Sequence, residues 1–107
     1  MLFRSMAAGG FVMEIGQGTA NLLPLVKPDH IRVYANNTLT ITSTQKISKI
    51  EFITVPNYEC KSFTSTVGEF DNTTGTWVGE AQNIVFKNEG QNIRQIRITG
   101  IRIYFAN

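Results

Sequence analysis

The sequence predicts an all-β protein, an antiparallel two-sheet β-sandwich of about 7-8 strands. Apolar and polar residues alternate along residues 93–105, read as I-R-Q-I-R-I-T-G-I-R-I-Y-F, which is the period of a strand that buries one face and exposes the other. Only 17% of the residues are charged, against roughly 25% in average globular proteins. Thr and Asn take their place, as on the exposed faces of extracellular β-sandwiches. No stretch of about 11 or more residues has helical periodicity.

Short apolar or alternating runs predict the preceding strands, and turn-forming residues separate them. The runs are residues 11–15, 31–34, 39–42, 47–54, 77–79 and 83–87. Asn36 and Asn37 predict a tight hairpin between 31–34 and 39–42, because Asn tolerates left-handed backbone. Pro24 and Pro28 indicate a crossover or an edge segment over residues 20–30, because proline lacks a ladder donor.

Other segments give weaker signals. D-N-T-T-G-T at residues 71–76 predicts a turn, in which Gly75 frees the sign of φ. Residues 58–70 form no clear strand, but Phe63, Val67 and Phe70 are large enough to cap a core.

Gly100 marks a break in the alternation of residues 93–105. Two apolar residues precede it at one parity and three follow it at the other. They are Ile96 and Ile98, then Ile101, Ile103 and Phe105. A one-residue bulge at Gly100 brings all of them onto one face. Residues 101–105 then need a pairing partner of their own, which we expect to be residues 1–10 or a second chain.

Length and charge limit the function classes. At 107 residues the chain is long enough for one core without disulfides or a structural metal. We expect one domain over residues 11–107, preceded by a fragment-like segment, 1–10, that lacks the apolar region of a complete signal peptide. The net charge of +2 without a basic run argues against nucleic acid as a partner. No window approaches the roughly 20 apolar residues of a membrane span.

The sequence predicts no catalytic residues, no metal site and no cofactor, so we expect the protein not to be an enzyme. Cys60 is a single cysteine, and His30, the one candidate base for a thiol nucleophile, follows Pro28-Asp29 in an apparent loop. The carboxylates are scattered, and no spacing selects a glycosidase pair. Asp71-Asn72 could offer oxygen ligands to calcium, but a turn is the simpler interpretation. No zinc spacing or phosphate-binding glycine loop occurs.

Aromatic and arginine side chains are the candidate ligand-binding residues. Trp77 is the single indole, and if exposed it would offer a platform for the apolar face of a sugar ring. A buried core position is the alternative, which the alternating context favours. A patch of tyrosines and arginines on strand faces could complete a binding surface, although solvated strand faces carry such residues anyway. Its members are Tyr34, Tyr58, Tyr104, Arg32, Arg97 and Arg102.

The order of these segments resembles a β-sandwich module that recurs in secreted and surface proteins of gut Bacteroidetes. The similar segments are I-R-V-Y-A-N-N-T-L-T-I-T-S (31–43), I-S-K-I-E-F (47–52), F-T-S-T-V-G-E-F (63–70), G-T-W-V-G-E-A-Q-N-I-V-F (75–86) and R-Q-I-R-I-T (94–99). The resemblance implies a jelly-roll-like fold, a secreted or cell-surface location and no assigned catalytic residues. The family has a further strand before residues 11–15, and its last strand ends near Thr99.

Two functions follow as expectations. The first is a non-catalytic carbohydrate-binding or adhesive accessory module, whose partner is a glycan or another surface ligand. The second is a structural or assembly subunit, of a surface fibre or a phage particle, that forms homo-oligomers through its chain ends or edge strands. The first predicts exposed aromatic residues in a groove or at a loop end, and the second predicts a large apolar contact between chains.

Overall fold

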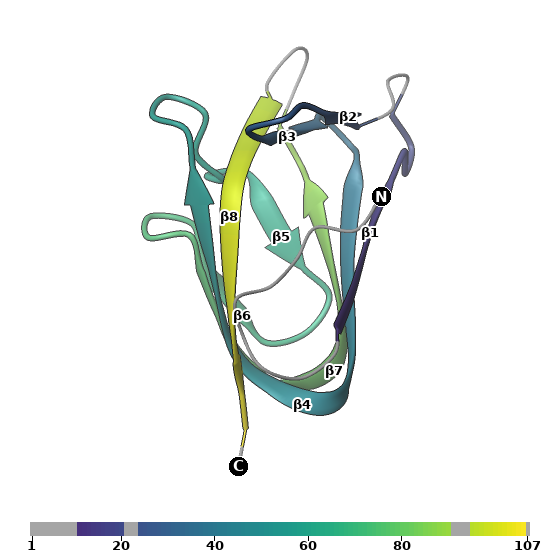
Figure 1. Cartoon of the computed structure of the whole chain (residues 1–107), viewed down its shortest axis with the longest axis vertical. Helices are drawn as coiled ribbons and strands as arrows, with labels where there is room; N and C mark the ends of the chain where they lie inside the picture. Colours follow the sequence, from purple (N-terminus) through teal and green to yellow (C-terminus); the bar gives the residue numbers. More distant parts are fainter. Residues whose placement is uncertain (1–10, 21–23, 91–94, 107) are drawn as a thin grey trace.

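The computed structural model describes residues 11–20, 24–90 and 95–106 and contains strands but no helix in these ranges. The prediction of an all-β antiparallel fold is therefore confirmed, with eight strands (Figure 1). They are β1 (Phe11–Gly16), β2 (Leu25–Val26), β3 (Ile31–Tyr34), β4 (Thr38–Thr54), β5 (Phe63–Ser65), β6 (Glu69–Asp71), β7 (Thr76–Asn88) and β8 (Gln95–Phe105). The described part of the chain forms no helix that could cross a membrane.

All eight strands belong to one continuous hydrogen-bonded sheet, with the order β2-β3-β8-β4-β7-β5, in which β1 also pairs with β4 and β6 with β7. The long strands β4 and β7 pair with each other and curve together at the bottom of the view in Figure 1. Before the bend, β4 pairs with β1, and after it with β8. Two separate sheets are thus not confirmed, because β4 and β7 carry the pairing through the bend.

The bend explains why the sequence predicted two shorter strands in place of β4 (39–42 and 47–54) and two in place of β7 (77–79 and 83–87). The register between β4 and β7 shifts between Thr42 and Ile47 and again between Ile47 and Lys49. Residues 44–46 of β4 are exposed and polar, so they interrupt the alternation that marks a strand. The register shift also buries Ile47 on the same side as Ile50, whereas Ile53 stays exposed.

The bulge predicted near Gly100 in β8 is confirmed. Gly100 pairs with Ile53 and Ile98 with Thr54, so Thr99 is the extra residue on β8. The isoleucines on both sides of it all lie in the core, and Phe105 packs against them. They are Ile96, Ile98, Ile101 and Ile103, each at most 4% exposed. Residues 101–105 pair with the second half of β4, so the expectation that residues 1–10 or a second chain would supply their partner is wrong.

Asn36 has a φ of 68°, so the predicted turn between β3 and β4 is present, but the predicted hairpin is wrong. β3 pairs with β2 and β8, and β4 pairs with β1, β7 and β8. The corner is held instead by the end of β7, where Asn88 exchanges backbone hydrogen bonds with Asn36 and Asn37 at 2.6 and 3.0 Å. A left-handed Asn fixes the local turn, but it does not choose which strand the chain pairs with next.

The core joins isoleucines of both halves of the sheet to a cluster of aromatic rings. Phe52, Phe63, Phe70 and Phe86 contact one another with ring centroids 5.0–6.1 Å apart. Phe63 and Phe70 pack on the core as expected, but Val67 is 42% exposed and does not. Residues 1–10, where a fragment-like segment was predicted, lie outside the described residues.

The segment with Pro24 and Pro28 forms an edge, as predicted. Its two-residue strand β2 pairs only with β3 among the described strands, through Leu25–Arg32 and Val26–Ile31. The amide of Lys27 donates to the carbonyl of His30 at 2.8 Å and closes the turn into β3. This turn places His30 and Arg32 beside β8.

Candidate functional site

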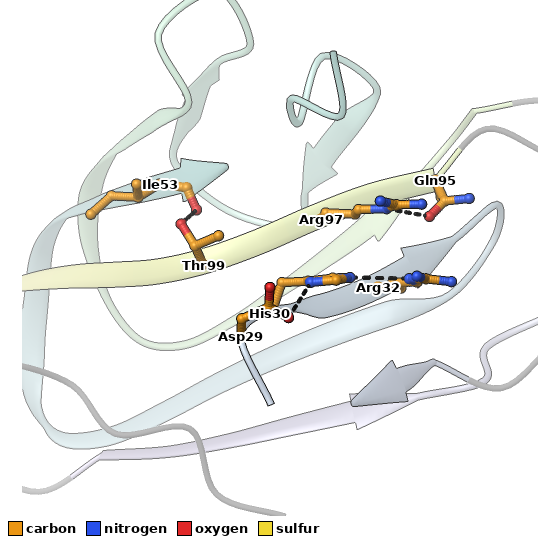
Figure 2. Close-up of polar contacts among 7 residues, drawn as sticks. All are labelled: Asp29, His30, Arg32, Ile53, Gln95, Arg97 and Thr99. Carbon is orange, nitrogen blue, oxygen red and sulfur yellow. Dashed lines mark hydrogen bonds and ion pairs between the residues drawn. The ribbon is translucent and has the colours of Figure 1, made fainter. Parts of the chain in front are cut away.

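The outer face of β3 and β8 brings two arginines directly opposite each other. Arg32 and Arg97 are register partners in the antiparallel pair, next to the buried pairs Ile31–Ile98 and Val33–Ile96. Because side chains alternate across a strand, burial of these neighbours turns both arginines outward, where each is half-buried. Figure 2 shows the two guanidinium groups on adjacent strands.

Arg32 is oriented by the residue two positions before it on the same face. Its Nε donates to Nε2 of His30 at 3.1 Å, and Nδ1 of His30 lies 2.8 Å from Oδ1 of Asp29 (Figure 2). Nε2 must be unprotonated to accept this bond, so the proton of the neutral ring is on Nδ1 and points to Asp29. The His30 side chain is only 10% exposed. The hydrogen bond between His30 and Asp29 lowers the pKa of the Asp29 carboxyl.

Arg97 is also oriented by the residue two positions before it, which lies toward the other end of the strand pair because β8 runs antiparallel to β3. Its Nε donates to Oε1 of Gln95, again two residues earlier, at 2.8 Å. The guanidinium carbon lies 3.9 Å from the centroid of the Tyr58 ring, a stacked cation–π contact. The backbone fixes this contact, because the Arg97 amide donates to the Tyr58 carbonyl at 3.1 Å and the Val55 amide donates to the Arg97 carbonyl at 3.0 Å.

The two guanidinium groups retain unneutralised charge. Among the described residues, no carboxylate lies within ion-pair distance of either group, and their Nη atoms have no hydrogen-bond acceptor there. Like charges directly opposite on a sheet destabilise the pair. Two fixed guanidinium groups with free Nη atoms are suited to bind an anion.

The other predicted arginine and tyrosine of β8, Arg102 and Tyr104, form a separate cluster around Glu51. The Tyr104 hydroxyl donates to Glu51 Oε1 at 2.8 Å, Lys49 Nζ lies 3.4 Å from Glu51 Oε2, and Arg102 Nη1 lies 4.0 Å from Oε1. The hydroxyl of Tyr104, and then the nearby cations, lower the pKa of Glu51. Here Arg102 already has a carboxylate partner, which would repel an added anion, so we do not assign this cluster to the anion site.

Of the remaining predicted site residues, Trp77 does not reach a ligand. It is fully buried, and its Nε1 donates to the Val67 carbonyl at 2.7 Å. The interpretation as a core residue is therefore confirmed, and that as an exposed sugar platform is wrong. Tyr34 is half-buried at the end of β3, in register with Gln95 and so at the margin of the arginine pair. Tyr58 is present at the site, but its ring lies under Arg97.

The other candidate chemistry stays separate from this face. Cys60 is 2% exposed, and burial raises the pKa of its thiol to about 11, which makes it a poor nucleophile. Oδ1 of Asp71 accepts the amides of Thr73 and Thr74 at 2.9 and 3.4 Å and so stabilises the turn, as expected. No group of three potential metal-ligating side chains occurs in residues 11–20, 24–90 and 95–106.

An open depression of about 410 Å³ lies along β6 and β7, away from the arginine pair. Its lining residues are Glu69, Phe70, Asp71, Thr74, Thr76 and Val78. Phe70 packs against the core, Val78 is 47% exposed, and the acidic residues face solvent. The depression therefore combines a small apolar surface with negative charge, which does not complement an anion.

His30 and Gln95 were not predicted as part of the site, although the sequence carries a signal for them. H-I-R at 30–32 and Q-I-R at 95–97 are the same pattern, an acceptor and an arginine on one strand face around a buried isoleucine. Antiparallel pairing places His30 and Gln95 on opposite sides of the arginine pair.

Comparison of the chain with protein-family models, with curated proteins and with solved structures finds no match.

Proposed function

We propose that the protein is a non-catalytic binding module, secreted or on the cell surface, that holds a carbohydrate or another surface ligand against the outer face of β3 and β8. The observation that supports this function is the pair Arg32 and Arg97, opposed in register without a carboxylate partner among the described residues. Each Nε is bonded to a neighbour, so the side chains are held in place.

The pair is easier to explain by binding than by stability. An arginine placed for stability usually faces a carboxylate, as Arg102 of β8 faces Glu51 on β4. Arg32 and Arg97 instead face each other, and an anion bound between or beside them would remove the repulsion. The N–H groups of a guanidinium are donors fixed in a planar fork, which suits them to bind and orient a ligand.

A binding screen tests the function. The purified protein is titrated by calorimetry with soluble polysaccharides, both neutral and acidic, and the same series is repeated with Arg97→Gln. We expect saturable binding to at least one polysaccharide, weakened by Arg97→Gln and unchanged by Arg102→Gln, which removes an equal charge from the same strand. Absence of binding across the series, or equal binding by the Arg97→Gln variant, would contradict the proposal.

The second function, an assembly subunit, is favoured by one observation at the sheet edge. β2 is a two-residue strand that pairs with β3 alone among the described strands, and its Leu25 and Val26 are 40% and 39% exposed, so its outer edge is a candidate for strand addition. Light scattering at increasing protein concentration distinguishes the two functions. A stable multimer that Leu25→Lys dissociates, together with no polysaccharide binding, would favour assembly.

A further inference from the structure

We propose that the group recognised at the β3–β8 face is a carboxylate of an acidic polysaccharide, held by the Nη atoms of Arg32 and Arg97. This inference rests on the proposed binding function and names the ligand class at the same site. A site of this kind would bind acidic polysaccharides in preference to neutral ones.

The orientation of each guanidinium group determines which edge faces the ligand. Nε of Arg32 is occupied by His30 and Nε of Arg97 by Gln95, so the edge formed by Nη1 and Nη2 is the one left free of partners within the described residues. Two parallel N–H groups at this edge match the two oxygens of a planar carboxylate. A bidentate contact from one or both arginines is therefore available without breaking an existing hydrogen bond.

The site is also ordered before the ligand arrives. Arg97 is fixed by Gln95 on one side and by the Tyr58 ring beneath it, and Arg32 is fixed by His30, whose ring is held by Asp29. Arginine loses considerable side-chain entropy when it is immobilised, so prior fixation favours binding. The surrounding isoleucines are buried, which ties the position of both arginines to the core.

A carboxylated sugar fits this face better than a nucleic acid does. Nucleic-acid surfaces combine several phosphate contacts with exposed aromatic rings that stack on bases. The chain has a net charge of only +2, Trp77 is buried and the Tyr58 ring is covered by Arg97. One or two fixed positive groups complement isolated carboxylates, such as those along a polyuronate.

The test compares polygalacturonate with the same polymer after methyl esterification, which removes the charge and keeps the sugar. Calorimetry is carried out with the wild type and with Arg32→Gln, Arg97→Gln and Arg97→Lys, and thermal unfolding by circular dichroism confirms that each variant is folded. We expect binding to polygalacturonate that esterification abolishes. Either Gln substitution weakens it about tenfold or more, the range for a charged hydrogen bond. Arg97→Lys also weakens it, because lysine keeps the charge but loses the planar edge.

Arg102→Gln is the matched control, since it changes the net charge equally on the same strand, and it should bind like the wild type. Equal binding to the esterified polymer would overturn the carboxylate inference and leave the binding function standing. Equal affinity for dextran sulfate or for single-stranded DNA, or equal loss in Arg102→Gln, would overturn it in favour of non-specific charge attraction. No binding to any polysaccharide would overturn both the inference and the proposed function.

Discussion

Trp77 and Gly79 offer a sharp test of the packing at the start of β7. They lie two residues apart on the same side of the strand, and the indole extends over Gly79. A Cβ atom added at Gly79 would be 2.8 Å from Cζ2 and 3.0 Å from Cη2 of Trp77, and 3.2 Å from Cα of Gly68. Gly79→Ala therefore forces the buried indole to move.

The magnitude follows from this crowding. Overpacking a core by one methyl group typically costs about 1–3 kcal/mol, and the contact with a fully buried ring puts Gly79→Ala near 2 kcal/mol. Trp77→Phe replaces the indole by a smaller ring and so removes Cζ2 and Cη2, the two atoms closest to the added Cβ, at a cost of about 2 kcal/mol. In that background we expect Gly79→Ala to cost less than about 1 kcal/mol, because only the Gly68 contact remains. The coupling free energy is then at least about 1 kcal/mol.

Guanidinium chloride unfolding followed by far-ultraviolet circular dichroism measures all four members of this cycle, since this signal comes mainly from the backbone and persists in Trp77→Phe. Gly75→Ala is the control: Gly75 has a φ of 73°, and a Cβ added there would meet Cys60 and Phe52 and not Trp77, so a left-handed backbone cost of about 1–2 kcal/mol persists in both backgrounds. If Gly79→Ala destabilises the wild type and the Trp77→Phe variant equally, the indole does not occupy the space over Gly79 and the reasoning is refuted.

Three further predictions concern buried or paired polar groups. Asn88→Ala should lower the free energy of unfolding by about 2–4 kcal/mol, because the buried amide accepts hydrogen bonds from Ser62 and Gly90 and donates one to Val33. Ser62→Ala, which removes only one of these bonds, should lower it by about 1 kcal/mol. Equal losses in the two variants would contradict this. Burial raises the pKa of the Cys60 thiol to about 11. At pH 8, Cys60 should therefore react with a thiol reagent at least about a hundredfold more slowly in the folded than in the urea-unfolded protein. Equal reaction rates in the two states would disprove the burial. Tyr104→Phe should raise the pKa of Glu51 in an NMR titration, because the hydroxyl favours the carboxylate. The folded pKa of Glu51 lies below the unfolded one, so its contribution to stability is present above the unfolded pKa and lost as the pH falls through the folded pKa. An unchanged pKa in Tyr104→Phe would count against the bond.

Local patterns in the sequence were sufficient to predict the bulge in β8 and the apolar residues that β8 buries. The change of parity at Gly100 predicted the bulge, because the buried isoleucines on its two sides can share a face only with an extra residue between them. With that extra residue, Arg97 and Arg102 both lie on the face opposite the buried isoleucines. Burial of Trp77 followed from its alternating context in the same way.

Long-range pairing was beyond the reach of these patterns. Arg32 and Arg97 are far apart in the chain, and they meet only because β3 pairs with β8 and not with β4 after the Asn36 turn. The stacking of Tyr58 on Arg97 depends on a loop held by backbone hydrogen bonds to β8. Alternation specifies which face a residue occupies, but it does not specify the neighbouring strand.

NMR of the arginine side chains tests the central claim, that Arg32 and Arg97 form one prepared anion site, most directly. The Nε–Hε resonances of Arg32, Arg97 and Arg102 are followed while trigalacturonate is added. We predict that the resonances of Arg32 and Arg97 shift together and saturate at one affinity, while that of Arg102 stays in place beside Glu51. Binding that leaves Arg32 and Arg97 unmoved, or that moves all three alike, would contradict the claim.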